Sequence, residues 1–168
     1  RFKILKNIGV EEFADRSVPT LFINSGANGS GLFFRALKDI VNLFENGSIN
    51  DLRVIFLAGK NGKLKHKAEK LTQNYQNNFK IVGFVTLKEM GAILQSSHIQ
   101  ISKPGANAIF EMIYTNTPMI IYGPTMLQEE ECVEFACEYN NFAVKLGENY
   151  KLLSPVIKNW YYSNSFDG

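Results

Sequence analysis

A glycine-rich run near the start of the chain contains the residue types that bind phosphate. Residues 25 to 31 read Ser-Gly-Ala-Asn-Gly-Ser-Gly. Glycines let a ligand approach the main chain closely, and free amides at the start of a following helix attract a phosphate or diphosphate. The run is equally compatible with a tight strand-to-helix turn that binds nothing. It is not a P-loop, because no Gly-Lys-Ser/Thr follows, and no acidic residue ends the next strand as a dinucleotide fingerprint requires.

A second polar run, from residue 102 to residue 107, precedes an apolar helical segment that carries the carboxylate Glu111. The run reads Ser-Lys-Pro-Gly-Ala-Asn. A carboxylate within the first two turns of a helix can accept hydrogen bonds from the two hydroxyls of a ribose. It can also complement the helix dipole, and for Glu111 considered alone this is the favoured interpretation.

A third candidate is the run Gln128-Glu129-Glu130-Glu131. An acidic cluster at a helix start is usually a solvated cap. Gln128 and Glu129 could instead point toward a sugar, whose hydroxyls bind amide and carboxylate groups. The sequence does not separate these two interpretations.

The remaining reactive residues predict no self-contained catalytic set. His66 lies in a lysine-rich segment and His98 beside a strand, and neither has the neighbours of a hydrolase triad. Cys132 and Cys137 lie five residues apart in a predicted helix, on different faces, which argues against a disulfide or a metal site. We expect both to be reduced thiols.

Composition indicates one soluble globular domain. The 168 residues are 45% hydrophobic and 20% charged, with a formal net charge of +2. Lysine and arginine are scattered along the chain, which argues against a nucleic-acid-binding protein. No apolar run approaches the length of a membrane-spanning helix. The chain begins at Arg1, so we expect the native N-terminus to lie further upstream.

Strand-like and helix-like segments alternate along the chain. Short β-branched or aromatic runs predict strands at Thr20–Asn24, Leu52–Ala58, Phe79–Val82, His98–Ser102, Pro118–Tyr122 and Phe142–Lys145. Segments of helical character predict helices at Leu32–Phe44, Lys63–Tyr75, Leu87–Gln95, Ala106–Tyr114, Gln128–Tyr139 and Lys151–Trp160.

This alternation predicts an α/β fold, a Rossmann-like three-layer sandwich with a six-stranded parallel sheet and right-handed crossovers. Ligands bind such sheets at the carboxyl ends of the strands. The loops at 24–31, 83–86, 102–107 and 122–129 are therefore the candidate binding loops. We interpret residues 1–18 as the irregular end of an interdomain linker, 19–162 as the domain, and 163–168 as a frayed tail.

Five ordered motifs between residues 18 and 145 resemble the C-terminal domain of family 28 glycosyltransferases. This group includes monogalactosyldiacylglycerol synthase, processive diacylglycerol glucosyltransferases and the peptidoglycan N-acetylglucosaminyltransferase. The motifs are the glycine run at 25–31, Gly83-Phe84-Val85, Ser102–Gly105 with Glu111, Pro118–Ile121, and Gln128-Glu129. The segment Ile4 to Val18 also resembles the chain that leads into this domain in the lipid galactosyltransferases.

The resemblance implies one half of a GT-B fold, the half that binds a UDP-sugar. It implies diphosphate contacts from the glycine run, uracil recognition by the backbone of Val85, ribose binding by Glu111, and phosphate contacts from the helix start at 105–108. The implied nucleotide-binding residues are Gly26, Ala27, Asn28, Gly29, Ser30, Phe84, Val85, Gly105, Ala106, Asn107, Ala108 and Glu111. The implied sugar-binding residues are Gln128 and Glu129.

The implied reaction is inverting transfer of a hexose from a UDP-sugar to an acceptor hydroxyl of a lipid or polyprenyl-linked molecule. No metal or other cofactor is implied, and no Asp-x-Asp pair is present. The general base would come from the other, N-terminal half, so we expect this chain to bind donor without transferring sugar. The resemblance places the protein in the cytoplasm, at the inner face of the membrane, with peripheral association through the other half.

Two alternatives stay open. One is a non-catalytic nucleotide-sugar-binding or regulatory module. This alternative is supported by four positions that differ from the family pattern. Ser25 and Ala27 stand where the family often has glycine, Ala108 where threonine is common, and Cys132 where asparagine is expected. The other is half of a UDP-sugar 2-epimerase, which is disfavoured because that chemistry needs an acid and a base near the sugar.

Overall fold

A parallel sheet of six strands forms the centre of the computed structural model, which describes residues 1–138 and 142–163. The strand order is β3-β2-β1-β4-β5-β6, and every neighbouring pair is parallel. The strands are β1 (Thr20–Asn24), β2 (Arg53–Leu57), β3 (Phe79–Val82), β4 (Ile99–Ser102), β5 (Met119–Tyr122) and β6 (Ala143–Gly147). The predicted sheet is confirmed, with small differences at strand ends.

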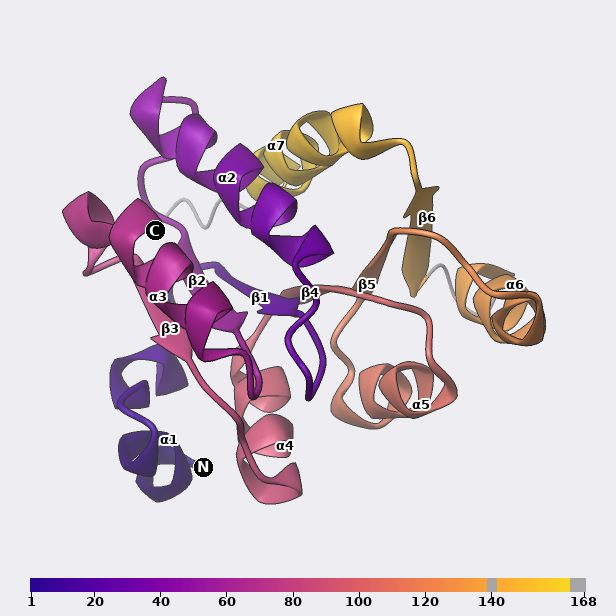
Figure 1. The fold of residues 1–168 in the computed structure, drawn as a ribbon, viewed down its shortest axis with the longest axis horizontal. Coiled ribbons are helices and arrows are strands. Elements are labelled where there is room, and N and C mark those ends of the chain that lie inside the picture. The colour runs from indigo at the N-terminus through magenta and orange to yellow at the C-terminus, as the bar shows by residue number, and fades with distance from the viewer. Residues whose placement is uncertain (139–141, 164–168) are drawn as a thin grey trace.

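Helices cover both faces of the sheet, so the fold has the three predicted layers (Figure 1). They are α1 (Phe2–Asn7), α2 (Leu32–Glu45), α3 (Gly62–Leu71), α4 (Leu87–Ser96), α5 (Ala106–Thr115), α6 (Glu130–Glu138) and α7 (Leu153–Ser163). Helices α2, α3 and α7 lie on one face, and α1, α4, α5 and α6 on the other. In the part of the chain that the structure describes, no helix is long and apolar enough to cross a bilayer.

Alternating side chains of the strands divide the interior into separate cores. Leu21 and Ile23 of β1 pack with α2, whereas Phe22 between them packs with α1 and α4. Successive residues of a strand point to opposite faces, and all three are fully buried. This explains why β1 is an unbroken apolar run rather than an alternating one.

Short 3₁₀ turns adjoin three of the helices. The predicted helix Lys63–Tyr75 ends early, at Leu71, and a 3₁₀ turn follows at Gln73–Tyr75. At this end the buried Thr72 hydroxyl donates a hydrogen bond to the Ala68 carbonyl, 3.0 Å away. Similar turns at Leu127–Glu129 and Tyr150–Leu152 precede α6 and α7.

The first eighteen residues are more ordered than the sequence indicates. The irregular segment expected there contains α1 and a 3₁₀ turn at Glu11–Ala14, so that expectation is wrong. Leu5 and Phe13 are fully buried against the β2 and α4 side of the sheet, which offsets the entropy of ordering them. An ion pair of 2.7 Å joins Glu12 to Lys80 on β3. The linker role of this segment remains a prediction, and residues 164–168 of the expected frayed tail lie outside the described residues.

The strand order reverses between β1 and β4. In open α/β sheets, the crevice outside the carboxyl ends of the strands at such a reversal is where ligands bind. The loops that follow β1 and β4 are the glycine run and the 102–105 run, so the topology brings the first two candidate motifs together.

Candidate functional site

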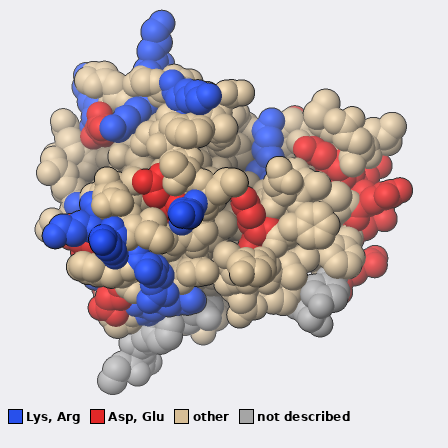
Figure 2. Space-filling view, turned by 90° about the horizontal axis from the view of Figure 1, so that it is seen from below, with Lys and Arg blue, Asp and Glu red and all other residues tan. Residues whose placement is uncertain are grey.

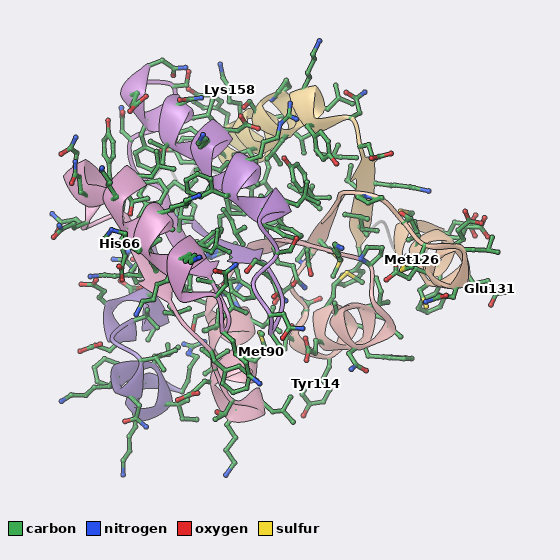
Figure 3. All side chains as sticks on the ribbon, in the orientation of Figure 1. His66, Met90, Tyr114, Met126, Glu131 and Lys158 are labelled. Carbon is green, nitrogen blue, oxygen red and sulfur yellow. The ribbon has the colours of Figure 1, made fainter. Side chains whose placement is uncertain are left out.

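Two adjoining hollows lie at the carboxyl edge of the sheet, and together we call them the trough. The smaller has a volume of about 260 Å³ and the larger about 440 Å³. Ala27, Met90 and Glu111 line both hollows, so the two are continuous. Met90 extends from α4 toward the loops that follow β1 and β2 (Figure 3). The combined space is of the size that holds a small-molecule ligand.

Hydrogen bonds to its neighbours fix the glycine run. The Ala27 carbonyl accepts from the Lys60 amide at 2.8 Å, and the Gly29 carbonyl accepts from the Asn61 side chain at 3.0 Å. The Ser25 hydroxyl donates to the Leu57 carbonyl of β2. The Ser25 side chain therefore ties this loop to the neighbouring strand.

Three amides of the run remain available to a ligand. The Gly26, Gly29 and Ser30 amides donate within the loop. The Ala27, Asn28 and Gly31 amides have no acceptor among the described residues. A trans peptide opposes its C=O and N–H, so the Ala27 carbonyl directed at Lys60 turns the Asn28 amide away from the loop after β2.

The departure at Ala27 is tolerated by the backbone. Positive φ angles occur at Gly26 (+80°) and Gly29 (+71°), whereas Ala27 is absent from the positive-φ residues described. The methyl group of Ala27 therefore carries no positive-φ penalty.

The start of α5 leaves its first amides free. Its N-cap residue is Gly105, which has no capping side chain. The amides of Ala106, Asn107 and Ala108 have no acceptor among the described residues, and Asn107 and Ala108 line the larger hollow. Free amides at a helix start favour an anion. Lys103 lines the same hollow and adds a positive charge.

Glu111 belongs to the trough rather than to the helix cap. It is the sixth residue of α5, and the first turn of this helix contains no acidic residue. The dipole interaction falls off within the first turn, which weakens the capping interpretation. Its half-buried carboxylate has no hydrogen-bond partner among the described residues, and burial raises the pKa of Glu111 above its ordinary value. A ribose diol would supply two donors to this carboxylate.

The smaller hollow has an apolar lining that suits a flat base. Val85 is buried, whereas the Phe84 side chain is 57% exposed at the edge of the hollow. The main-chain N–H and C=O of Val85 have no partner among the described residues. Unpaired main-chain groups of this kind can pair with the edge of a base.

The structure does not bring every predicted residue to the trough. Asn28, Gly29, Ser30, Ala106 and Gln128 do not line it, and Gln128 is exposed. Glu129 lines the larger hollow, but one of its carboxylate oxygens accepts from the Met126 amide at 2.9 Å. Glu129 therefore acts as a cap in this structure, while its sugar-binding role stays a prediction.

Several residues of the site escaped the sequence prediction. Lys103 and Asn24 lie in the candidate loops at 102–107 and 24–31, but they were not among the predicted binding residues. The residues Gly59, Lys60 and Asn61 follow β2 and support the glycine run, yet no motif marked them. Met90 lies in the middle of a helix and reaches the trough only through tertiary packing.

Charged side chains are unevenly distributed over the surface. Figure 2 shows carboxylates gathered at the end of the molecule where α6 lies in Figure 1, and lysine and arginine side chains mostly toward the other end. Among residues 1–138 and 142–163, no group of three or more His, Cys, Asp or Glu side chains could hold a metal ion.

Comparisons with known proteins point to one family. The model of the glycosyltransferase family 28 C-terminal domain matches residues 20–146. A processive diacylglycerol beta-glucosyltransferase of Bacillus pumilus is 27% identical over 155 residues, which are 92% of this chain but 37% of that protein. The chain thus spans little more than a third of this relative.

Solved structures share the fold at low sequence identity. Acinetobacter baumannii MurG superposes with a TM-score of 0.67 at 12% identity, over 89% of this chain and 43% of that one. The UDP-GlcNAc 2-epimerase of Neisseria meningitidis, bound to UDP-GlcNAc, gives 0.70 at 11% identity, over 97% of this chain and 40% of that one.

Proposed function

The chain belongs to the family of glycosyltransferase family 28 C-terminal domains, and from that premise we propose that it is the UDP-sugar-binding half of an inverting hexosyltransferase. The acceptor in this proposal is a hydroxyl of a lipid or cell-envelope molecule. The relatives named as diacylglycerol glucosyltransferases support a lipid acceptor, and the UDP-GlcNAc-bound neighbour supports a UDP-sugar donor.

One observation carries the donor-binding proposal. Free main-chain donors of two loops and an unpartnered carboxylate meet in a single trough at the strand-order reversal. These groups match the parts of a nucleoside diphosphate in order, with Val85 at the base, Glu111 at the ribose and the start of α5 at the diphosphate. Any one of these features alone would be weak evidence.

The chain's contribution to the reaction is electrostatic in this proposal. As the sugar leaves UDP, negative charge grows on the diphosphate. The amides of Asn107 and Ala108, the dipole of α5 and the Lys103 ammonium stabilise this charge without reorganising. The base that activates the acceptor hydroxyl belongs to the rest of the protein, and no metal or other cofactor takes part.

The epimerase alternative shares the fold but has weaker support. Structural likeness at 11% identity shows fold alone. The family match and the 27% identical relative are both glycosyltransferases. We therefore favour transfer, with peripheral attachment to the inner face of the membrane through the rest of the protein.

Nucleotide selectivity tests donor binding. Ligands that bind the native state raise its melting temperature. We expect UDP to raise the melting temperature of the 168-residue chain by several degrees more than ADP does, measured by calorimetry. Equal shifts for the two nucleotides at millimolar concentration would remove the evidence for uridine recognition.

Replacing Glu111 tests the ribose contact. We expect Glu111→Gln to weaken UDP binding about tenfold, because a hydrogen bond to a charged acceptor is stronger than one to a neutral amide. Glu134→Gln, on the exposed side of α6, is the matched control and should leave affinity unchanged.

Comparing the pH dependence of the parent chain with that of Glu111→Gln separates an effect on UDP binding from an effect on folding. Because its pKa is higher in the folded chain, Glu111 takes up its proton more readily there, so lowering the pH through that pKa favours the folded state. UDP affinity should fall over the same range, since protonation removes an acceptor. In Glu111→Gln both trends should be lost. A large stability loss at neutral pH would instead support the capping interpretation.

A further inference from the structure

Gly59, Lys60 and Asn61, which follow β2 after Ala58, hold the glycine run in place, and we call them the clasp. Gly59 has a φ of +59°, and a Cβ atom there would collide with the Gly26 and Ala27 carbonyl oxygens. The Lys60 amide and the Asn61 side chain bind the loop as described above. The clasp therefore contacts the diphosphate side of the trough through its backbone and through Asn61.

The side chain of Lys60 reaches the other side of the trough. Its ammonium lies 5.1 Å from the centre of the Phe84 ring, a cation–π contact. Phe84 lines the smaller hollow, whereas Lys60 does not, so the ammonium contacts the ring from outside the hollow. Among the described residues Lys60 has no carboxylate partner, and the ring is its side-chain contact.

We propose that Lys60 is a positioning residue for the nucleotide base, acting by holding the exposed Phe84 ring as a wall of the smaller hollow. The Phe84 side chain is 57% exposed, so a cation over its face limits the positions of the ring. The same residue hydrogen-bonds the glycine run through its amide. Lys60 thereby couples the position of the base wall to that of the diphosphate loop. This proposal rests on the donor-binding function and names a residue that acts on the base.

Lysine variants measured with two ligands test the proposal. Uridine contains the base but no phosphate, so it separates an effect through Phe84 from a direct charge effect on phosphate. We expect Lys60→Met to weaken the binding of UDP and of uridine by the same factor, about three- to fivefold, as loss of an exposed cation–π contact predicts. Lys60→Arg keeps the cation and should bind both ligands within about twofold of the parent chain.

Phe84→Leu completes a double-mutant cycle. If Lys60 acts through the ring, Lys60→Met should have no further effect on affinity once Phe84 is leucine. Lys63→Met, at an exposed position near the start of α3, is the control for general loss of charge and should bind UDP as the parent chain does. The melting temperature of Lys60→Met should stay within about 2 °C of the parent, because its backbone bond to Ala27 is retained.

The outcomes distinguish this proposal from the function it rests on. A chain that binds neither UDP nor uridine overturns both. Parent-like binding by Lys60→Met overturns the role of Lys60 alone. A loss for UDP with none for uridine shows that the ammonium acts on phosphate, which also overturns a role through Phe84.

Discussion

Helices α3 and α4, which follow β2 and β3, have side-chain N-caps, whereas α2 and α5, which follow β1 and β4, have none. At α3, the Asn61 side chain accepts from the Leu64 amide. At α4, Thr86 and Glu89 form a reciprocal capping box. Neither α2 nor α5 has a side-chain cap, and the N-cap residue of each is glycine.

We attribute this difference to the proposed donor site rather than to helix stability. Every helix start leaves amides without an intrahelical acceptor. At α3 and α4 the chain satisfies some of them itself. The two uncapped starts flank the strand-order reversal, where an anion can satisfy them instead. The comparison shows which of these helix starts keep amides without a side-chain cap.

The largest expected effect is a loss of stability on disturbing the clasp. The clasp holds the glycine run, which leads into the uncapped start of α2. Gly59→Ala should lower the free energy of unfolding by about 2–4 kcal/mol, since it combines a positive φ with a backbone collision. Urea denaturation measures this. Gly91→Ala, in α4 with no atom near its added Cβ, is the control and should be neutral or stabilising. Equal stability of the two variants would refute the described packing.

A side-chain cap at the start of α5 should weaken UDP binding and stabilise the unliganded chain. An acceptor side chain at the N-cap competes for the amides that we assign to the diphosphate. Gly105→Asp should stabilise the unliganded chain by a few tenths of a kcal/mol. It should weaken UDP binding by about tenfold or more, since it also places a negative charge at the start of α5. Calorimetry measures both. Gly105→Asn caps without charge and should give an intermediate loss. Undiminished UDP affinity in the aspartate variant would exclude α5 from the phosphate site.

Removing an existing cap should have the smallest effect, and on stability alone. Glu89 accepts hydrogen bonds from the Thr86 amide at 2.7 Å and from its hydroxyl at 2.9 Å. Glu89→Ala should cost about 1 kcal/mol in thermal unfolding and leave UDP affinity unchanged. Lys88→Ala, at an exposed neighbouring position, serves as control. A parallel loss of UDP affinity would mean that capped and uncapped starts do not differ in function.

Strand and helix positions followed from the sequence because they depend on local patterns. The predicted bounds of β1 and β3 matched the observed ones. For β1 the signal is a buried apolar run followed by a turn. The N-terminal segment was misjudged for the opposite reason. Leu5 and Phe13 are too widely spaced to show a periodicity, and they are buried by β2 and α4, which are far away in the sequence.

The sequence by itself determined the α/β class, the alternation of strands and helices, and the polar loops where a ligand could bind. Composition and short-range spacing are sufficient for these features, because they arise from neighbouring residues. Only the tertiary structure decided which amides stay free, that Glu111 lies over the trough, and that Lys60 contacts Phe84. Those features depend on hydrogen bonds and packing between residues distant in the chain, and such pairings leave no periodic signal in a single sequence.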